Sequence, residues 1–327
     1  MVKYSFIVAV YNISKYINRC MDSLLNQTIK DYEIIVVNDG STDDSLEKIR
    51  KYEQVIKIVN KENGGLASAR NKGMEVATGE YCVFIDGDDF VKRDYLEIFD
   101  KKIAKNNTLD IVMGGYTSLN NNKEKKVEYN DLLNIVQYQN IYLKMIGPSS
   151  KESSFKRYTM SVWGKCYRRK FLIDNHISFK SERQYISEDL VFHTDILRFK
   201  PTISFVINVG YVYVNNDYES LTRIYKEDRI LREIELHNYL LVNTPSLSNL
   251  DKYRLYYNFL ERFDGVLRKL LIQNKDTIAM NALSCQELDN AINYCSEFPK
   301  TIKAKIRIFY LKKKNMLLLK IIAKIRR

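Results

Sequence analysis

Three carboxylates that follow a short apolar run are the residues of this chain best suited to chemistry. Residues 81–85 are apolar and predict a buried strand, and Asp86, Asp88 and Asp89 come directly after it. Because strand side chains alternate between faces, Asp86 and Asp88 can point the same way. Two such carboxylates repel each other unless a positive charge lies between them. A divalent cation holding the phosphates of a substrate would supply it, whereas a solvated acidic loop is the plainer alternative.

Polar residues follow two other predicted strands. Tyr11 and Asn12 end the apolar strand 4–10, and Asp39 follows the strand 34–37. The Asp39 carboxylate could accept hydrogen bonds from a ribose or a base edge, or it could cap the helix that comes next.

A glycine pair opens the predicted helix 64–77. Helix N-termini favour anionic groups, and Arg70 in this segment could reach a diphosphate. No Gly-Lys-Ser/Thr follows at the spacing of a Walker A loop. An ordinary amphipathic helix explains most of the segment, except that the small residues 67–69 indicate close packing or ligand approach.

A second acidic pair, Glu188 and Asp189, lies about 100 residues beyond the first, and a solvated helix start is its plainer explanation. His193 would share a helical face with Asp189, so it is a candidate third metal ligand or else a structural histidine. Trp163, the single tryptophan, is expected in the core or in a pocket wall.

The elements that must position these residues alternate between strand and helix. A helix capped by Ser14 should follow the first strand, with its apolar side chains at positions 17, 20, 21, 24 and 25. The further expected strands are 55–59, 81–85 and 110–113, and the further helices are 43–52 and 93–105. This alternation predicts an α/β domain with a mostly parallel sheet, in which ligands bind at the carboxyl ends of the strands.

The rest of the chain is less regular. Residues 120–130 are polar and predict an exposed loop, 155–220 contain mixed short elements, and the pattern from 221 onward is helical. Boundaries near 115 and 221 divide the chain into segments 1–115, 116–220 and 221–327.

The composition predicts a globular protein: 45% of the residues are hydrophobic and 28% charged. Five cysteines without metal-ligand spacing predict reduced core residues in a cytoplasmic protein. We expect no signal peptide ahead of the first strand, and no apolar run approaches the roughly 18 residues of a membrane-spanning helix.

The net charge of +12 is concentrated at one end of the chain. Residues 300–327 contain 11 Lys and Arg and no acid, which leaves +1 for the remainder. We therefore expect no nucleic-acid partner for the globular part.

Four segments together resemble the family 2 glycosyltransferases. They are Val8 to Asn12, Val36 to Asp43, Asn63 to Gly73 and Phe84 to Asp89, in that family's order and at its usual separations over roughly residues 3–115. A weaker match continues through Trp163-Gly164-Lys165, Glu188-Asp189 and Tyr211 to Ser220, and none is found after 221.

The resemblance implies a GT-A fold, a Rossmann-like and mostly parallel sheet flanked by helices, with a nucleotide-diphosphate sugar as donor. Tyr11 and Asp39 would hold the nucleoside, usually uridine. Arg70 would lie near the diphosphate, Asp86 would contact ribose or sugar, and Asp88 would bind Mn²⁺ or Mg²⁺.

The resemblance also implies an inverting transfer with Asp189 as the general base. The acceptor would be a hydroxyl of a glycan or of a lipid-linked acceptor in cell-surface polysaccharide synthesis. Ala9 departs from the family's frequent proline, and the Gln-x-x-Arg-Trp motif of processive synthases is missing, so we expect one sugar per encounter.

Two other classes of function remain open at this point. An aspartyl-nucleophile phosphohydrolase also places Asp-x-Asp after a strand, but usually after the first strand of its core. A non-enzymatic membrane- or nucleic-acid-binding module would fit the net charge, but the near-neutral charge outside the tail opposes it.

The basic tail predicts two linked amphipathic helices. Their apolar faces are expected to comprise Ile302, Ile306, Phe309 and Tyr310, and then Leu317, Leu318, Ile321, Ile322 and Ile325. Such helices lie in anionic membrane surfaces, so we expect peripheral attachment to the inner face of the cell membrane through residues 300–327. The alternative is that they pack on the enzyme's own core with their lysines facing water.

Overall fold

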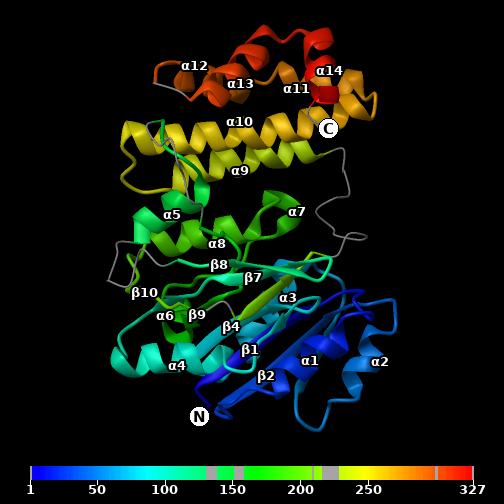
Figure 1. The fold of residues 1–327 in the computed structure, drawn as a ribbon, viewed down its shortest axis with the longest axis vertical. Helices are drawn as coiled ribbons and strands as arrows, with labels where there is room; N and C mark the ends of the chain where they lie inside the picture. Colours follow the sequence, from blue (N-terminus) through cyan, green and yellow to red (C-terminus); the bar gives the residue numbers. More distant parts are fainter. Residues whose placement is uncertain are drawn as a thin grey trace. The chain divides into compact units, whose positions relative to one another are not determined.

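The structure is a computed structural model that describes residues 2–129, 138–150, 158–207, 210–215, 228–298 and 301–325. The chain forms two compact units (Figure 1). The sheet unit contains residues 1–139, 161–182 and 188–220, and the helical unit contains residues 140–160, 183–187 and 221–327.

A seven-stranded sheet forms the centre of the sheet unit, in the order β10-β6-β9-β4-β1-β2-β3. All neighbouring strands are parallel except β9, which runs antiparallel to both β4 and β6. The strands are β1 (Tyr4–Val10), β2 (Tyr32–Asp39), β3 (Lys57–Lys61), β4 (Tyr81–Asp86), β6 (Ile111–Met113), β9 (Lys165–Arg168) and β10 (Ile203–Phe205). The predicted α/β fold with a mostly parallel sheet is confirmed.

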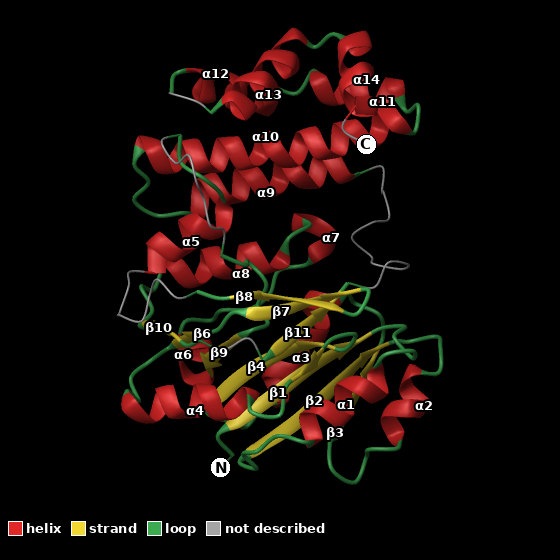
Figure 2. Cartoon of the chain, in the orientation of Figure 1, coloured by secondary structure: helices red, strands yellow, loops and turns green. Residues whose placement is uncertain are grey.

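Helices pack along the strands of this sheet, as Figure 2 shows in red against yellow. They are α1 (Ile17–Leu25), α2 (Ser45–Arg50), α3 (Leu66–Val76), α4 (Tyr95–Lys105), α6 (Arg169–Asp174) and α8 (Glu188–Leu197). Every residue of β1 is buried, and its side chains alternate between two layers. Phe6 and Val8 join a core cluster with α1, α2 and α4, whereas Ile7 points to the other face and meets α3 at Gly73.

The N-terminal end of α1 differs from the prediction. Ser14 was expected to cap this helix, but the N-cap is Tyr16, without a capping side chain. The Ser14 backbone N–H instead donates to Asp43 Oδ2 at 3.0 Å, and its carbonyl accepts a hydrogen bond from Lys48. The β1–α1 and β2–α2 connections therefore hold each other, a long-range contact that local capping rules cannot reveal.

A second sheet, β5-β11-β7-β8, contains a strand where a loop was predicted. Its strands are β5 (Phe90–Val91), β7 (Tyr116–Asn120), β8 (Lys123–Val127) and β11 (Tyr211–Val214). Residues 120–129 therefore form no simple loop, since β8 pairs antiparallel with β7. Edge strands often carry lysines because these resist further pairing. The sequence of β8, Lys-Glu-Lys-Lys-Val, therefore has the composition of a loop although it forms a strand.

The helical unit is built around α10 (Asn249–Ile272), which is held at its start by a Ser248–Asp251 capping box. The other long elements are α9 (Arg229–Asn243), α11 (Asp276–Leu283), α12 (Gln286–Ser296), α13 (Ile302–Lys313) and α14 (Met316–Ile325), together with the shorter α5 (Tyr138–Ile146) and α7 (Glu182–Tyr185). The described residues between 228 and 325 form helices joined by short turns. The expected boundary at 221 lies outside the described residues, and the division at 115 between donor and acceptor halves stays a prediction.

Two further expectations concern residue environment. All five cysteines are free and four are buried, in agreement with reduced core residues. Within the described ranges, no helix combines the length and the apolarity needed to cross a bilayer.

Two helical glycines should respond in opposite ways to alanine. A Cβ on Gly73 would lie 2.3 Å from Ile7 Cγ2, whereas a Cβ on Gly265 of α10 would meet nothing within 4 Å. We expect Gly73→Ala to lower the free energy of unfolding by about 1–3 kcal/mol through overpacking. Gly265→Ala should raise it by ~0.5–1 kcal/mol through helix propensity. Urea denaturation followed by circular dichroism measures both, and equal stability of the two variants would contradict the close approach of α3 to β1.

Candidate active site

The polar residues singled out at the ends of three strands come together at one edge of the sheet. In the parallel register Val10 lies beside Asn38, and Ala9 lies beside Asp86. Tyr11, Asp39 and Asp86 therefore share the carboxyl edge of β1, β2 and β4, where such sheets bind ligands.

Arg70 is the centre of this site. Its side chain is 2% exposed, and Nη2 lies 2.8 Å from Asp86 Oδ1. Nη1 lies 2.7 Å from Asp189 Oδ1 and 3.0 Å from Glu188 Oε1. One guanidinium from α3 thus joins the carboxylate that ends β4 to the two that begin α8. The two acidic segments thus meet at Arg70, although about 100 residues separate them.

The hydrogen-bond partners of Arg70 differ from the predicted one. It was predicted to lie near a diphosphate, but both terminal nitrogens donate to carboxylates of the protein. Because these partners surround a buried guanidinium, Arg70 orients the acidic residues. Its place near a diphosphate stays a prediction that these contacts do not favour.

Three carboxylates facing one cation leave an excess of negative charge. Burial and the neighbouring Asp189 raise the pKa of Glu188 to about 8, against the opposing effect of Arg70. Burial also raises the pKa of Asp189, although Arg70 and Lys165 lower it. Glu188 therefore holds a proton at neutral pH, which reduces the repulsion around Arg70.

Lys165 belongs to the weaker family match, but no role was predicted for it, and its charge acts on Asp189. Burial lowers the pKa of this lysine to about 7, and Asp189 opposes the shift. It begins β9, donates to the Ser161 carbonyl and is fully buried. Trp163, two residues before it, stacks on Tyr211 with ring centroids 4.5 Å apart, so the tryptophan is a core residue.

Asp39 holds the glycine turn and does not cap the next helix. Its carboxylate accepts hydrogen bonds from Gly64 N at 3.0 Å and from Gly65 N at 2.7 Å, and Lys61 Nζ lies 2.6 Å away. The backbone N–H at the start of α2, that of Ser45, donates to Asp43 instead. Asp39 lies at the predicted edge, and its contact with a nucleoside stays a prediction.

The N-terminus of α3, expected to favour an anionic group, is filled by the protein itself. Leu66 N and Ala67 N each donate to the Glu182 carboxylate at 3.2 Å. Gly65 has φ 91°, and a Cβ there would lie 1.9 Å from Glu182 Oε1, so glycine is required. Four successive backbone N–H groups, from 64 to 67, are thus satisfied by Asp39 and Glu182, which leaves this turn without free donors for phosphate.

The carboxylates that end β4 have three different environments. Asp86 pairs with Arg70, whereas Asp89 is buried and accepts from Tyr211 Oη at 2.6 Å and from Val214 N at 2.8 Å. Asp88 has no ion pair, and no other described residue donates a hydrogen bond to its carboxylate. Burial and repulsion by Asp86 raise the pKa of Asp88 to about 6. A nearby cation would relieve this cost, which makes Asp88 the best candidate metal ligand.

The described residues fit a divalent ion only as part of its site, which the phosphates of the substrate and water would complete. Among the described residues, no three His, Cys, Asp or Glu are arranged to hold a metal. Mg²⁺ is commonly bound by one or two carboxylates together with substrate phosphates and water, and Asp88 suits that arrangement.

His193 gains no support as a second ligand. It follows Asp189 by one turn of α8, as predicted, but its ring is fully buried beside Phe192 and Tyr167, with Nδ1 2.5 Å from Tyr138 Oη. A role in metal binding therefore stays a prediction that this geometry does not favour.

Tyr11 is the exposed aromatic residue of the edge, with 38% of its surface accessible. Asn12, which follows it in a left-handed conformation (φ 53°), accepts a hydrogen bond from Thr42 N at 2.8 Å. The turn that presents the Tyr11 ring is thus fixed, while the ring itself is free to stack on a base.

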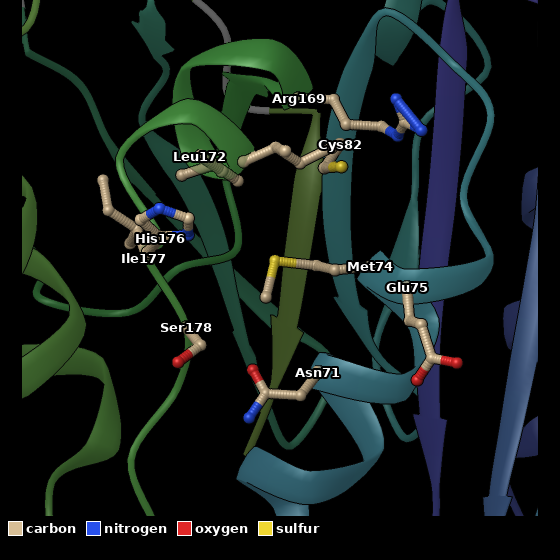
Figure 3. A pocket seen from close by; sticks show the side chains of 10 residues that line it. Asn71, Met74, Glu75, Cys82, Arg169, Leu172, His176, Ile177 and Ser178 are labelled. Atoms are coloured by element: carbon tan, nitrogen blue, oxygen red, sulfur yellow. The ribbon is translucent and has the colours of Figure 1, made fainter.

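A cavity of about 440 Å³ lies elsewhere on the sheet unit (Figure 3). It is lined by Asn71 and Met74 of α3, Cys82 near the start of β4, and Leu172 of α6. Cys82 precedes Asp86 by four residues, or about 13 Å along a strand, so this cavity is not the acidic site.

Comparison with solved structures identifies the fold. The crystal structure of S. aureus TarS 1-349 in complex with UDP-GlcNAc matches with a TM-score of 0.69 at 22% identity, over 99% of this chain and 91% of that one. The mannosyltransferase PcManGT from Pyrobaculum calidifontis matches with a TM-score of 0.52 at 18% identity, over 98% of this chain and 86% of that one. At these identities the likeness shows the fold, which is the predicted GT-A fold with C-terminal helices.

Sequence relatives give the family. The family model "Glycosyl transferase family 2" matches residues 5–164. Glycosyltransferase GlyA of Streptococcus pneumoniae is 36% identical over 51% of this chain and 24% of its own length. Glycosyltransferase EpsJ of Bacillus subtilis is 33% identical over 67% of this chain and 63% of its own length. Through these residues the chain belongs to glycosyltransferase family 2, and it spans less than two thirds of the length of either relative.

The raised pKa of Glu188 predicts how stability depends on pH. The folded pKa is about 8 and the unfolded value is about 4.3, so between these values the folded state binds more protons and the free energy of unfolding falls as pH rises. Glu188→Gln should flatten this decline between pH 5 and pH 8, as measured by urea denaturation. Glu47→Gln, an exposed change on α2, should keep the wild-type slope. Identical slopes for Glu188→Gln and wild type would contradict the assignment.

Proposed function

We propose that this protein transfers a sugar from a nucleotide-diphosphate sugar, preferably a UDP-sugar, to a hydroxyl of a glycan or lipid-linked acceptor in cell-surface polysaccharide synthesis. The observation that carries the proposal is the Arg70 cluster, which joins Asp86 on the donor side to Asp189 on the acceptor side. Family membership supports the reaction class and argues against the phosphohydrolase alternative.

The names of similar proteins support the choice of substrates. The TarS structure contains UDP-GlcNAc. A poly(ribitol-phosphate) beta-glucosyltransferase of Bacillus spizizenii is 31% identical over 68% of this chain and 34% of its own length. The first supports a nucleotide-sugar donor, and the second supports a polymer as the acceptor class.

On the donor side, the residues at the strand ends orient the nucleotide. The exposed ring of Tyr11 can stack on the base, and Asp86, held by Arg70, faces the ribose or sugar. A Mn²⁺ or Mg²⁺ ion bound by Asp88 would stabilise the departing diphosphate as a Lewis acid. Because Arg70 and the turn at 64–67 are already paired within the protein, an ion held by Asp88 would supply positive charge to the phosphates.

On the acceptor side, Asp189 takes the proton of the attacking hydroxyl. Arg70 and Val162 N, at 2.7 and 3.3 Å, fix the two carboxylate oxygens of Asp189. Burial raises the pKa of both carboxyls, but Arg70 and Lys165 oppose this rise for Asp189, and these two cations favour Asp189 as the base. Attack opposite the leaving diphosphate inverts the anomeric carbon, and no carboxylate nucleophile is required, unlike in a retaining glycosidase.

Asp88 should make donor binding metal-dependent. In calorimetric titration with UDP, EDTA should weaken binding to wild type by at least about tenfold, because a direct ligand should matter no less than the second-shell residues of metal sites. Asp88→Ala should bind weakly with Mn²⁺ and with EDTA alike. Asp94→Ala, an exposed change in the same unit, should behave as wild type. Equal affinities in all conditions would refute the metal role.

Asp189→Asn should reduce transfer by about 10²–10⁴-fold, the usual contribution of a positioned base, and leave UDP affinity nearly unchanged. The measurement is the rate of UDP release with the donor found by screening UDP-sugars against lipid-linked acceptors. Asp195→Asn is the matched control, since it lies on the same helix and pairs with Lys180 at 3.4 Å. If Asp189→Asn transfers normally while Glu188→Gln does not, the base is Glu188.

A further inference from the structure

The last two helices of the helical unit expose apolar side chains at helical spacing. On α13 these are Ile302, Ile306 and Phe309, which are 78%, 49% and 58% exposed. On α14 they are Leu317, Ile321 and Ile325, which are 71%, 48% and 77% exposed. Spacings of three and four residues place each set on one face of its helix, and we call these two sets the apolar stripes.

The opposite faces of both helices already pack on the unit's own core. Ala304, Ile308 and Leu311 of α13, with Leu319 and Ala323 of α14, belong to the cluster built around α10. The single apolar face expected from the sequence is thus divided: Tyr310 is buried, while Ile302, Ile306 and Phe309 are not. Burial in the unit's core therefore does not account for the apolar stripes.

The basic residues of these helices also fall into two groups, those that form ion pairs with the helical unit and those that do not. Arg307 pairs with Asp264 and Glu261 of α10, at 3.3 and 2.9 Å. Lys314 pairs with Asp289 at 2.7 Å, and Lys320 pairs with Asp276. These three cations fasten α13 and α14 to the helical unit.

Five further lysines have no ion pair with any described residue, and no acid occurs between 301 and 325 to neutralise them. They are Lys303, Lys305, Lys312, Lys313 and Lys324, all exposed. At 100° per residue, Lys305 and Lys312 lie on one side of the α13 stripe and Lys303 on the other. Each stripe is therefore accompanied by positive charge alone.

We propose that the apolar stripes of α13 and α14 dock the protein on an anionic lipid bilayer. The inference deepens the proposed function, and it rests on that function where it connects docking to a lipid-linked acceptor. Apolar side chains would enter the boundary between headgroups and acyl chains, while the lysines reach anionic headgroups. A second copy of the chain is a poorer occupant, since it would bring five more unpaired lysines against these five.

Sedimentation with vesicles tests the proposal without donor or acceptor. Full-length protein should sediment with vesicles of phosphatidylcholine and phosphatidylglycerol at low salt, and remain in solution with phosphatidylcholine alone. Ile306→Ser with Phe309→Ser should weaken binding by at least about tenfold, because two apolar side chains would no longer leave water. Leu231→Ser with Val242→Ser, changes on α9 at side chains that are more exposed, should not weaken it.

A charge-matched pair separates the electrostatic part. Lys305→Glu with Lys312→Glu should weaken binding by about thirtyfold or more, given the contribution of each basic residue near an anionic surface. Lys252→Glu with Lys269→Glu, exposed on α10, makes the same change in net charge and should have a smaller effect.

Three results would overturn the proposal. Wild type could stay in solution with anionic vesicles, or the stripe and control variants could bind alike. Wild type could also form a dimer that the stripe variant loses in lipid-free ultracentrifugation, which would make the stripes a self-association surface. Unchanged UDP affinity and circular dichroism of each variant show that a loss of docking reflects neither misfolding nor a fault in the proposed donor site.

Discussion

One buried guanidinium is the interaction on which the site depends. Arg70 is removed from water and lies within 3.0 Å of three carboxylates from two distant parts of the chain. Breaking such a cluster leaves uncompensated buried charge, which costs about 3–5 kcal/mol. The pairing therefore fixes α3, the end of β4 and the start of α8 relative to one another. It also sets the protonation of the acidic residues, since one cation cannot neutralise three ionised carboxylates.

Carboxylates of the protein also occupy hydrogen-bond donors that could otherwise hold a nucleotide. Asp39 and Glu182 occupy the four N–H groups that a glycine-rich turn would offer to phosphate. The turn and Arg70 are both paired internally, so neither offers its charge to a diphosphate, and the exposed Arg19 beside the Asp88 carbonyl is a cation that remains near this edge. Asp88 is therefore important. It has no ion pair with a described residue, and burial raises its pKa, so a divalent ion would satisfy this carboxylate and the phosphates together.

Much of the fold follows from the sequence through short-range rules. The buried strands β1 and β4 are continuous apolar runs, and alternating strands and helices specify a mostly parallel sheet. Placement of Tyr11, Asp39 and Asp86 at one edge follows from the topology of such a sheet. The loop prediction for residues 120–130 failed because β8 pairs with its neighbour through backbone hydrogen bonds, which leave no mark in the side-chain composition. Its exposed lysines are as typical of an edge strand as of a loop.

The sequence by itself determined the family, the strand-end carboxylates and the basic amphipathic tail, because each is written in consecutive residues with a fixed period or spacing. Only the tertiary structure decided which carboxylate meets which cation. Glu182 lies 115 residues from Ala67, and Arg70 lies 119 residues from Asp189, so no local pattern encodes these pairs. The tail shows the same limit: its period predicts an apolar face, but packing on α10 selects which apolar residues are buried and which lysines stay unpaired. Burial and pairing are properties of the space around a side chain, and folding alone brings those neighbours together.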